Sequence, residues 1–392
     1  MVKNNIGRNE RLMLKGSLKK QGFDSWRLVT NAISALDGSE RTFFFEFYFL
    51  NPSVSSEEPI LGFKNRFEKS LEDLQYALAG TTSAQSATFQ DFVVPSFFMV
   101  RAGSFGFGGK QISNYFPCGN VEFGKNDFVI KVANQEKGEC VLAGDYCFGK
   151  LSVSKEELES HPEYLCSVGN ISWDLQFEKL IPLKFNSKDK ISNWSLISGK
   201  CNCEGKIFFD NEEFFVQPLK SFAYLDKNWG RDFSDSLLHL SSCDLTSLIT
   251  GQVLSSSCFA VQGEYNKKLS LLISVEGKNI EFNVNKSKKY KLNFNCTEMS
   301  PEKDGTVKLH WALSAQNKKN VVDIDIFCQT DKLFLRDYES PVGERKLMKV
   351  LSGIGSGELR IYKIRKKNLE LIEDISVSSC LAECGNIEFP EK

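Results

Sequence analysis

A run of aromatic side chains between Arg41 and Leu50, Arg-Thr-Phe-Phe-Phe-Glu-Phe-Tyr-Phe-Leu, limits what this 392-residue chain can fold into. Phenylalanine and tyrosine favour extended backbone, and consecutive strand residues point to opposite faces of a sheet. Apolar residues on both alternations therefore predict a strand buried on both faces, with Glu46 as the carboxylate inside it. The chain holds 32 Phe against 10 Tyr and 5 Trp, which favours an all-β fold with aromatic-lined barrels.

The second half of the chain has the pattern of consecutive hairpins. The stretches Leu269–Val275 and Ile280–Val284 flank a Glu-Gly-Lys turn. Val322, Ile324 and Ile326 alternate with acidic residues, as in a strand with one wet face. Many short strands between turn signals predict a sandwich or a barrel.

The length of the chain predicts two domains. We expect the boundary near Ser234, with a lipocalin-like antiparallel β-barrel in residues 1–234 and a second one in residues 235–392. Apolar residues recur at helical spacing from Phe63 to Leu78, which predicts a short helical insertion in the first barrel near residues 57–80. A second short helix is predicted at Ser154, where Ser-Lys-Glu-Glu has the form of a capping box.

Composition excludes several classes of function. The net charge is −1 and no region is strongly basic, so we expect no nucleic-acid partner. The N-terminal stretch has no apolar signal core, and no apolar run reaches the roughly 20 residues of a membrane helix. The twelve cysteines are then expected to be free thiols in a cytoplasmic protein.

The sequence contains no complete motif for binding a metal or a phosphate. The three histidines show no paired metal spacing, and C-x-C at Cys201–Cys203 with C-x₃-C at Cys380–Cys384 departs from the usual zinc knuckle. The glycines of 103–109 lead to Lys110-Gln111 rather than to Lys-Ser or Lys-Thr, so a turn between strands is expected there. The sequence therefore predicts no metal and no cofactor.

The most unusual polar residues are Asp226, Lys227 and Asn228, which stand in a row between Tyr224 and Trp229. Buried polar groups need hydrogen-bond partners. Asp226 could be a proton donor oriented by its two neighbours, or the three residues could fix a polar corner between domains.

Two further features are candidates for the same site. Glu46 is either a general acid or simply a partnered or exposed glutamate, and Trp26 and Trp173 each lie beside polar residues.

Several segments together resemble the bacterial branch of the tocopherol cyclase-like family, which is related to carotenoid hydratases. The strongest match is Ala-Tyr-Leu-Asp-Lys-Asn-Trp-Gly at residues 223–230. Weaker matches follow in order along nearly the whole chain, among them 22–27, 43–48, 101–103, 115–117, 172–174, 250–251, 355–357 and 361–363.

The resemblance implies two tandem lipocalin-like barrels with an apolar cavity, and cofactor-free acid-assisted cyclisation or hydration of an isoprenoid or prenylquinol ligand. Asp226 would donate the proton and Glu46 would be an auxiliary acid or cation stabiliser. The ligand site would be formed by Tyr224, Trp229, Asn228, Lys227, Trp26 and Trp173.

Whether the protein is an enzyme stays open at this point. The alternative is a lipid- or isoprenoid-binding protein without chemistry, and a third reading is a pair of filled barrels. In either ligand hypothesis, the partner is a hydrophobic small molecule collected in transient contact with a membrane surface.

Overall fold

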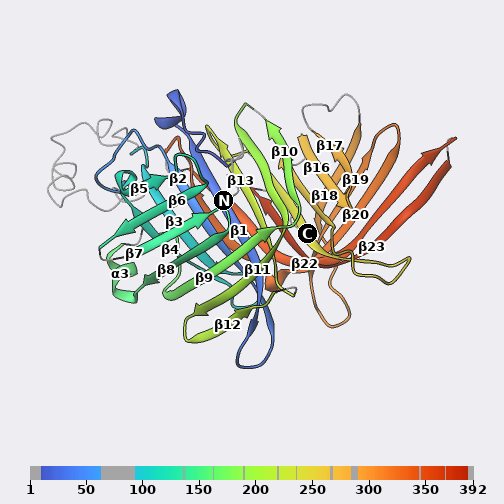
Figure 1. Ribbon diagram of the computed structural model, residues 1–392, viewed down its shortest axis with the longest axis horizontal. Coiled ribbons are helices and arrows are strands. Elements are labelled where there is room, and N and C mark those ends of the chain that lie inside the picture. Colours follow the sequence, from blue (N-terminus) through green and yellow to red (C-terminus); the bar gives the residue numbers. More distant parts are fainter. Residues whose placement is uncertain are drawn as a thin grey trace, which may run out of the picture.

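The computed structural model describes residues 10–386 apart from 63–92, 136, 162, 189, 219, 235, 265–267, 284–289, 344–345 and 367. It contains two antiparallel sheets (Figure 1). The strands of the first sheet are β1 (Phe23–Ser34), β2 (Glu40–Leu50), β3 (Phe97–Ser104), β4 (Lys110–Phe116), β5 (Val121–Phe123), β6 (Val129–Asn134), β7 (Gly138–Ala143), β8 (Tyr146–Val153), β9 (Gly169–Lys179), β10 (Pro182–Lys188), β11 (Ser192–Phe209), β12 (Glu212–Val216) and β13 (Phe222–Gly230).

The first sheet curls into a barrel. Its main hydrogen-bonded order is β4-β3-β2-β1-β12-β11-β9-β8-β7-β6-β5, and β13 lies between β1 and β11 and pairs with both. The curvature brings β4 into contact with β8 and β9, which lie far from it in the sheet order. The barrel thereby encloses one large apolar core.

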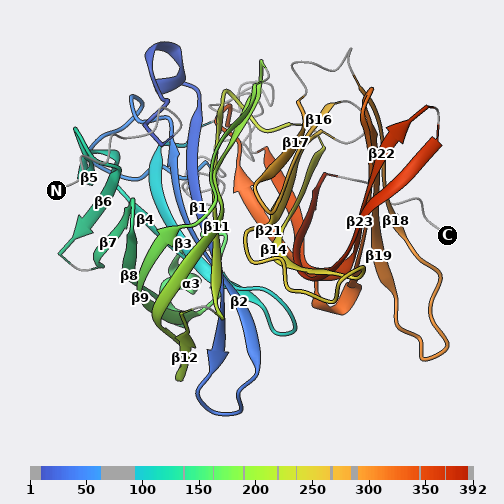
Figure 2. The ribbon, with the colours of Figure 1, turned by 45° about the vertical axis from the view of Figure 1, so that its right-hand side comes forward.

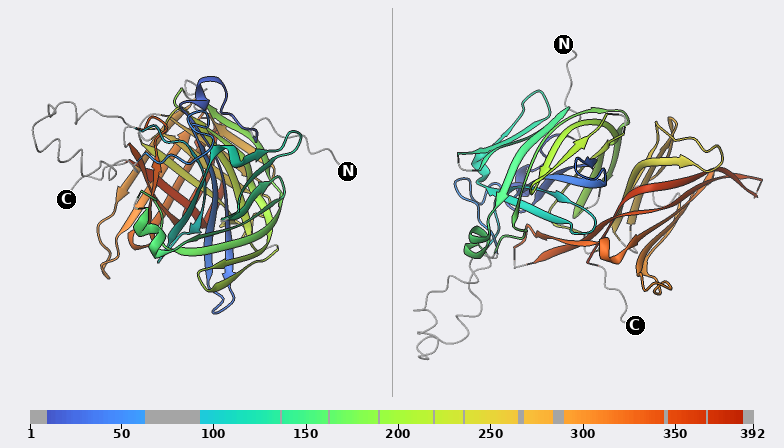
Figure 3. Two further views of the ribbon diagram at one scale, coloured as in Figure 1. Left: turned by 90° about the vertical axis from the view of Figure 1, so that its left-hand side faces the viewer. Right: turned by 90° about the horizontal axis from the view of Figure 1, so that it is seen from below.

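The second sheet forms an open half-barrel beside the first (Figure 3). Its main order is β17-β16-β15-β14-β23-β22-β20-β19-β18, with β21 added to β22. Its strands are β14 (Leu237–Ser247), β15 (Cys258–Glu264), β16 (Lys268–Val275), β17 (Lys278–Phe282), β18 (Lys291–Glu298), β19 (Lys308–Gln316), β20 (Asn320–Gln329), β21 (Phe334–Glu339), β22 (Leu347–Arg365) and β23 (Asn368–Gly385).

The prediction of an all-β protein with two barrel-like sheets in tandem is confirmed. The predicted hairpin turn at Glu276-Gly277 joins β16 to β17, with both residues at positive φ. Helix α3 (Lys155–Ser160) begins where predicted, because the Ser154 side chain accepts a hydrogen bond from the Glu157 backbone. The helix predicted from Phe63 to Leu78 lies outside the described residues.

The cysteine pairs considered as zinc ligands lie in separate cores. Cys201 and Cys203 belong to the core of the first barrel, whereas Cys380 and Cys384 belong to that of the second sheet. They therefore act as small apolar side chains.

Strand β2 is buried on both faces, as its sequence predicts. Phe43, Phe45, Phe47 and Phe49 point into the core of the first barrel. The alternate residues, including Phe44, Glu46 and Tyr48, are also buried, because the outer face of β2 packs against the second sheet.

The two sheets lie side by side (Figure 2), and side chains of both sheets pack together between them. Two apolar clusters, each containing residues of both sheets, form the two ends of this interface. One includes Phe23, Tyr48, Phe233, Tyr338 and Met348. The other includes Phe44, Trp194, Tyr224, Ala260 and Leu381. A layer of polar side chains lies between them, and we call it the polar layer. Its members are Arg27, Glu46, Arg101, Asp226 and Asn228 of the first sheet and His239, Gln262, Arg336, Ser352 and Glu383 of the second.

Candidate functional site

The first sheet contributes a row of alternating charges to the polar layer. Strand register places Asp226 of β13 beside Arg27 of β1, Arg27 beside Glu46 of β2, and Glu46 beside Arg101 of β3. Directly opposed residues on adjacent strands share a face of the sheet, so these four side chains point toward the second sheet. All four are at most 6% exposed.

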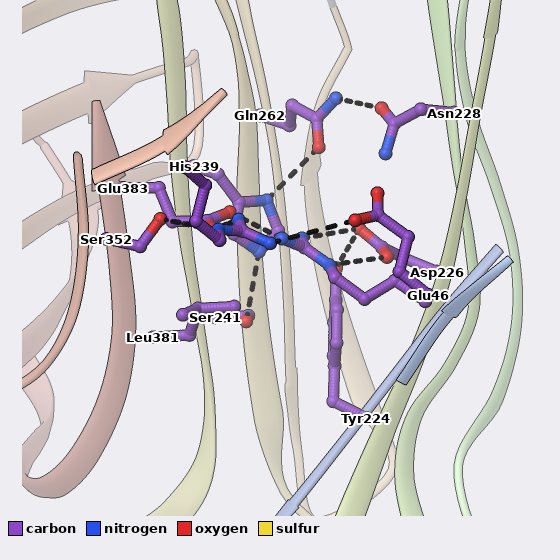
Figure 4. Close-up of polar contacts among 12 residues, drawn as sticks. Glu46, Tyr224, Asp226, Asn228, His239, Ser241, Gln262, Ser352, Leu381 and Glu383 are labelled. Carbon is purple, nitrogen blue, oxygen red and sulfur yellow. Dashed lines mark hydrogen bonds and ion pairs between the residues drawn. The ribbon is translucent and has the colours of Figure 1, made fainter. Parts of the chain in front are cut away.

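The second sheet contributes a matching row. Ser352 of β22 lies opposite Glu383 of β23, Glu383 lies opposite His239 of β14, and His239 lies opposite Gln262 of β15. Arg336 of β21 donates from Nε to Ser352 Oγ at 3.1 Å. The two rows meet in the interface, as Figure 4 shows for most of these residues.

Glu383 is the centre of the polar layer. Its Oε2 accepts a hydrogen bond from Arg27 Nη1 at 2.6 Å, and its Oε1 accepts from Ser352 Oγ at 2.9 Å and from Arg336 Nη2. Burial alone would raise the pKa of this carboxyl group, but the guanidinium groups of Arg27 and Arg336 outweigh it and hold the pKa well below its usual range. Glu383 is therefore ionised and joins the two sheets.

Asp226 is fully engaged within the first barrel. It accepts from Arg27 Nε at 3.2 Å and Nη2 at 3.1 Å, from the Tyr224 hydroxyl at 3.1 Å and from Trp194 Nε1 at 3.1 Å. It lies in the middle of β13, so the polar corner considered from the sequence is wrong: Asp226 and Asn228 belong to a strand and not to a turn. Asp226 fixes the guanidinium of Arg27.

Glu46 has a different environment from Asp226. Its Oε2 accepts a hydrogen bond from the Tyr338 hydroxyl of the second sheet at 2.9 Å, and Arg336 Nη1 lies 3.9 Å from the same oxygen. The guanidinium carbons of Arg101 and Arg336 lie 4.9 Å and 5.6 Å from the centre of the Tyr338 ring. The hydrogen bond from Tyr338 to Glu46 thus joins the two sheets.

A cavity of about 50 Å³ lies beside this pair. One part of its wall is polar and includes Arg27, Glu46, Arg336 and Glu383. The rest is mostly aromatic or apolar and includes Phe23, Tyr48, Phe233, Leu237, Tyr338, Met348 and Val350. The half-buried residues Ser192, Asn228, Ser234 and Leu237 lie at its margin.

His239 is buried in the polar layer as a neutral ring. Gln262 donates from Nε2 to Asn228 Oδ1, so Gln262 Oε1 is the acceptor that faces His239 Nδ1 at 3.1 Å. Nδ1 therefore carries the proton, and Nε2 accepts from Ser241 Oγ at 3.1 Å. Burial first, and the charge of Arg27 second, lower the pKa of His239 to about 4.

Three further predicted site residues, Trp26, Lys227 and Trp229, point away from the second sheet. In β13, Lys227 and Trp229 alternate with Asp226 and Asn228 and lie on the opposite face of the strand. Lys227 Nζ donates to Asp24 Oδ2 at 2.9 Å and lies 3.9 Å from the centre of the Trp26 ring. Burial raises the pKa of Asp24 to about 6 and lowers that of Lys227 to about 8.

Trp173 is separate from both groups. It is a core residue of the first barrel in β9, its ring centre lies 4.8 Å from that of Phe45, and its Nε1 donates to Cys147 Sγ at 3.1 Å. The structure therefore divides the predicted set in three. Glu46, Asp226 and Asn228 lie in the polar layer, which the Tyr224 hydroxyl reaches from the neighbouring apolar cluster. Trp26, Lys227 and Trp229 form a buried group on the other face of β1 and β13, and Trp173 lies in the core.

Sequence reasoning missed Arg27, Arg336, Tyr338 and Glu383. Glu383 carried the same signal as Glu46, a lone carboxylate within an apolar strand sequence, here between Ala382 and Cys384. No spacing in the sequence connects residues of β1 with residues of β21 and β23.

Within the described residues, no helix has the length and apolar character needed to cross a membrane. No protein-family model matches the chain, and no curated protein matches its sequence. The predicted membership of the tocopherol cyclase-like family stays a prediction.

Solved structures that superpose on the chain include an AttH candidate from Nitrosomonas europaea, with a TM-score of 0.42 and 10% identity over 93% of this chain and 92% of that one. They also include kievitone hydratase from Nectria haematococca, with a TM-score of 0.42 and 8% identity over 98% of this chain and 93% of that one.

Proposed function

We propose that this protein is a cofactor-free enzyme that adds an oxygen nucleophile to a double bond of a hydrophobic ligand of the isoprenoid or prenylquinol type. One observation carries the proposal. The phenol of Tyr338 in one sheet donates a hydrogen bond to the carboxyl group of Glu46 in the other, at the wall of a cavity between the sheets.

The wall of the cavity offers two different kinds of surface to a ligand. Its charged wall can receive a polar or reacting group, and Phe233, Leu237 and Met348 offer an apolar surface to the hydrocarbon part. Aromatic rings beside the reacting carbon stabilise a positive charge that develops there. The limited access of water to this buried site protects such a carbon from side reactions.

Addition across a double bond is redox-neutral and needs two proton transfers. One proton goes to one carbon while the nucleophile's oxygen bonds to the other carbon and loses a proton. Tyr338 supplies the first proton: burial raises its pKa above the ordinary value, so the phenol stays protonated at neutral pH. Glu46 takes the second proton and returns it to Tyr338 through their hydrogen bond, which restores both groups.

Asp226 takes a different part in this proposal from the one that the sequence suggested. Both of its oxygens already accept hydrogen bonds, and it holds Arg27, which in turn binds Glu383. We therefore assign proton transfer to Glu46 and Tyr338, and positioning of the charged wall to Asp226.

The experiment combines extraction and turnover. Small molecules that copurify with the protein are extracted into organic solvent and identified by mass spectrometry. Prenylated hydroquinones are then incubated with the protein in D₂O, and we expect one deuterium at a carbon of the former double bond. Glu46→Gln should bind the probe and reduce turnover by about 10²- to 10⁴-fold.

The matched control is Glu122→Gln, an exposed carboxylate on β5, which should leave turnover unchanged. Binding of the probe without deuterium incorporation by the unaltered protein would contradict the enzyme proposal and favour the non-catalytic lipid-binding alternative.

A further inference from the structure

The hairpin that joins β22 to β23 exposes apolar side chains at one end of the molecule (Figure 1). Strand register forms two cross-strand pairs there, Tyr362 with Leu371 and Ile364 with Leu369. Ile361, which precedes Tyr362, points into the core of the second sheet, so these two pairs lie on the other face of the hairpin. Leu369 is 58% exposed and Leu371 is 44% exposed.

The turn that follows β14 extends this apolar surface. The Leu248 backbone N–H donates to the Asp374 carbonyl at 2.7 Å, which places the turn beside the hairpin. Leu248 and Ile249 of the turn are each more than half exposed, and Ile372 of β23 is exposed as well. We call these residues together the apolar tip: Leu248, Ile249, Tyr362, Ile364, Leu369, Leu371 and Ile372. Exposed apolar side chains that gather in one place mark a surface for interaction.

Basic side chains surround one side of the apolar tip. The turn between β19 and β20 contains Lys318 and Lys319, and the Lys319 carbonyl accepts a hydrogen bond from the Ile364 backbone at 2.8 Å. Lys363, Arg365 and Lys366 lie at the end of the hairpin, and all five basic side chains are exposed. In the sequence, residues 317–320 and 363–370 hold six basic residues and one acidic residue, Glu370. This end of the sheet therefore carries an excess of positive charge.

The combination of an apolar centre and a basic rim matches the surface of a membrane that contains anionic lipid. Aliphatic side chains enter the boundary between headgroups and acyl chains, and lysines attract the anionic headgroups. A second copy of this chain fits the surface less well, because a symmetric contact would bring two basic rims together.

We propose that the apolar tip and its lysines bind the surface of a membrane that contains anionic lipid. None of the tip residues lines the cavity between the sheets, so the proposal does not depend on the reaction proposed above. It assigns the membrane contact expected from the sequence to one surface of the molecule and to one class of lipid.

The test is flotation of the full chain with phosphatidylcholine vesicles that contain or lack phosphatidylglycerol. We expect binding to the anionic vesicles and its loss at high salt, because salt screens the lysines. The double variant Leu369→Ser, Leu371→Ser should bind these vesicles at least about tenfold more weakly. Its matched control is Leu36→Ser, Phe107→Ser, because both residues are about 80% exposed but lie in turns of the first sheet.

The basic rim has its own pair of variants. Lys318→Gln, Lys319→Gln, Lys366→Gln should also weaken binding to the anionic vesicles by about tenfold or more. The control replaces three exposed lysines elsewhere, Lys15, Lys19 and Lys20, with glutamine and should bind like the unaltered protein. All the substituted side chains are exposed, so every variant should keep the fold, which circular dichroism checks.

Four results would overturn the proposal. They are no binding to either kind of vesicle, equal binding with and without phosphatidylglycerol, equal losses in the test and control variants, and a dimer in solution that the leucine substitutions convert to a monomer. The last result would make the apolar tip an interface between copies of this chain. Deuterium incorporation is measured without vesicles, so failure of vesicle binding leaves the proposed reaction standing, and absence of turnover leaves the membrane surface standing.

Discussion

Arg27 Nη1 donates a hydrogen bond to Glu383 Oε2 at 2.6 Å, although the two residues are 356 positions apart in the sequence. The bond connects β1 of the first barrel to β23 of the second sheet, and in the same layer Arg27 also pairs with Asp226 and Glu383 also pairs with Arg336. Removing one member of a buried ion pair leaves its partner as an uncompensated buried charge, so loss of Arg27 or Glu383 alone should destabilise the interface.

We expect Glu383→Gln to destabilise the protein by about 3–5 kcal/mol, because it leaves Arg27 and Arg336 without their shared carboxylate. Urea unfolding at pH 7 measures the loss. Glu370→Gln is the control, because Glu370 pairs with Arg365 at 2.6 Å but both side chains are about half exposed. That change should stay within about 1 kcal/mol. Equal effects of the two substitutions would contradict a central role for Glu383.

The same comparison has a defined pH dependence. The pKa of Glu383 is lower in the folded protein than its usual 4.5, so the unfolded chain takes up its proton first as the pH falls. The stability that Glu383 contributes is complete above about pH 4.5 and is lost as the pH falls further toward the folded pKa. The stability difference between the unaltered protein and Glu383→Gln should therefore shrink below about pH 4.5.

The buried pair of Asp24 and Lys227 gives a prediction of opposite sign. In the folded protein the pKa of Asp24 is about 6, above the ordinary 3.8, and the pKa of Lys227 is about 8, below the ordinary 10.5. Both shifts disfavour the charged form of the side chain. Stability falls as the pH rises from 3.8 to 6, because the folded state holds the Asp24 proton longer. It rises again from pH 8 to 10.5, because the unfolded state holds the Lys227 proton longer.

The double variant Asp24→Asn, Lys227→Met should remove this minimum of stability between pH 6 and 8. Its stability relative to the unaltered protein should be most favourable between pH 6 and 8. Each single variant at pH 7 should be less stable than the double one, because it leaves one buried polar group without its partner. Denaturant unfolding from pH 4 to 10 measures both, and a flat difference across this range would contradict the prediction.

His239 should remain neutral well below the pH at which an ordinary histidine is protonated. Its pKa of about 4 lies below the usual 6.5, so protonation of the unfolded chain makes stability fall as the pH drops from 6.5 to 4. NMR of ¹⁵N-labelled histidine at pH 5.5 should show a neutral ring protonated on Nδ1. Protonation of this ring near pH 6.5 would contradict the hydrogen-bond arrangement with Gln262 and Ser241.

Tyr338→Phe should lower turnover of a prenylated probe by about 10²-fold or more, because it removes the proposed proton donor while the ring remains. Tyr48→Phe is the matched control. Tyr48 also lines the cavity, but its hydroxyl donates to the backbone oxygen of Glu339 at 3.1 Å. Turnover should change less than tenfold in this second variant. Steady-state kinetics with both proteins, checked for equal folding by circular dichroism, decides the point.

The fold could be predicted from the sequence because its signals are local. Strand β2 shows both the success and the limit of such local signals. Apolar residues at consecutive positions predicted that both faces of this strand are buried. They did not reveal that one face is covered by the barrel's own core and the other by the second sheet.

The candidate site was predicted only in part, because strand alternation separates neighbours in the sequence. Asp226 and Asn228 face the second sheet, whereas Lys227 between them faces Asp24 on the other side of the strand. Partners such as Arg336 and Glu383 became recognisable only when register placed them in one layer. Long-range pairing of this kind depends on how two sheets pack, and no residue spacing in one sequence encodes it.

The distance between Arg27 and Glu383 along the sequence also determines which part of the polar layer is synthesised first. A ribosome makes the first barrel, including the Arg27–Asp226 pair, long before residue 383 is translated, and domains generally fold in that order. Until β23 emerges, the nascent first barrel exposes an incomplete charged row and the aromatic outer face of β2 to the cell. Translation speed and chaperone contact over the last strands should therefore govern how much of the newly made chain escapes aggregation.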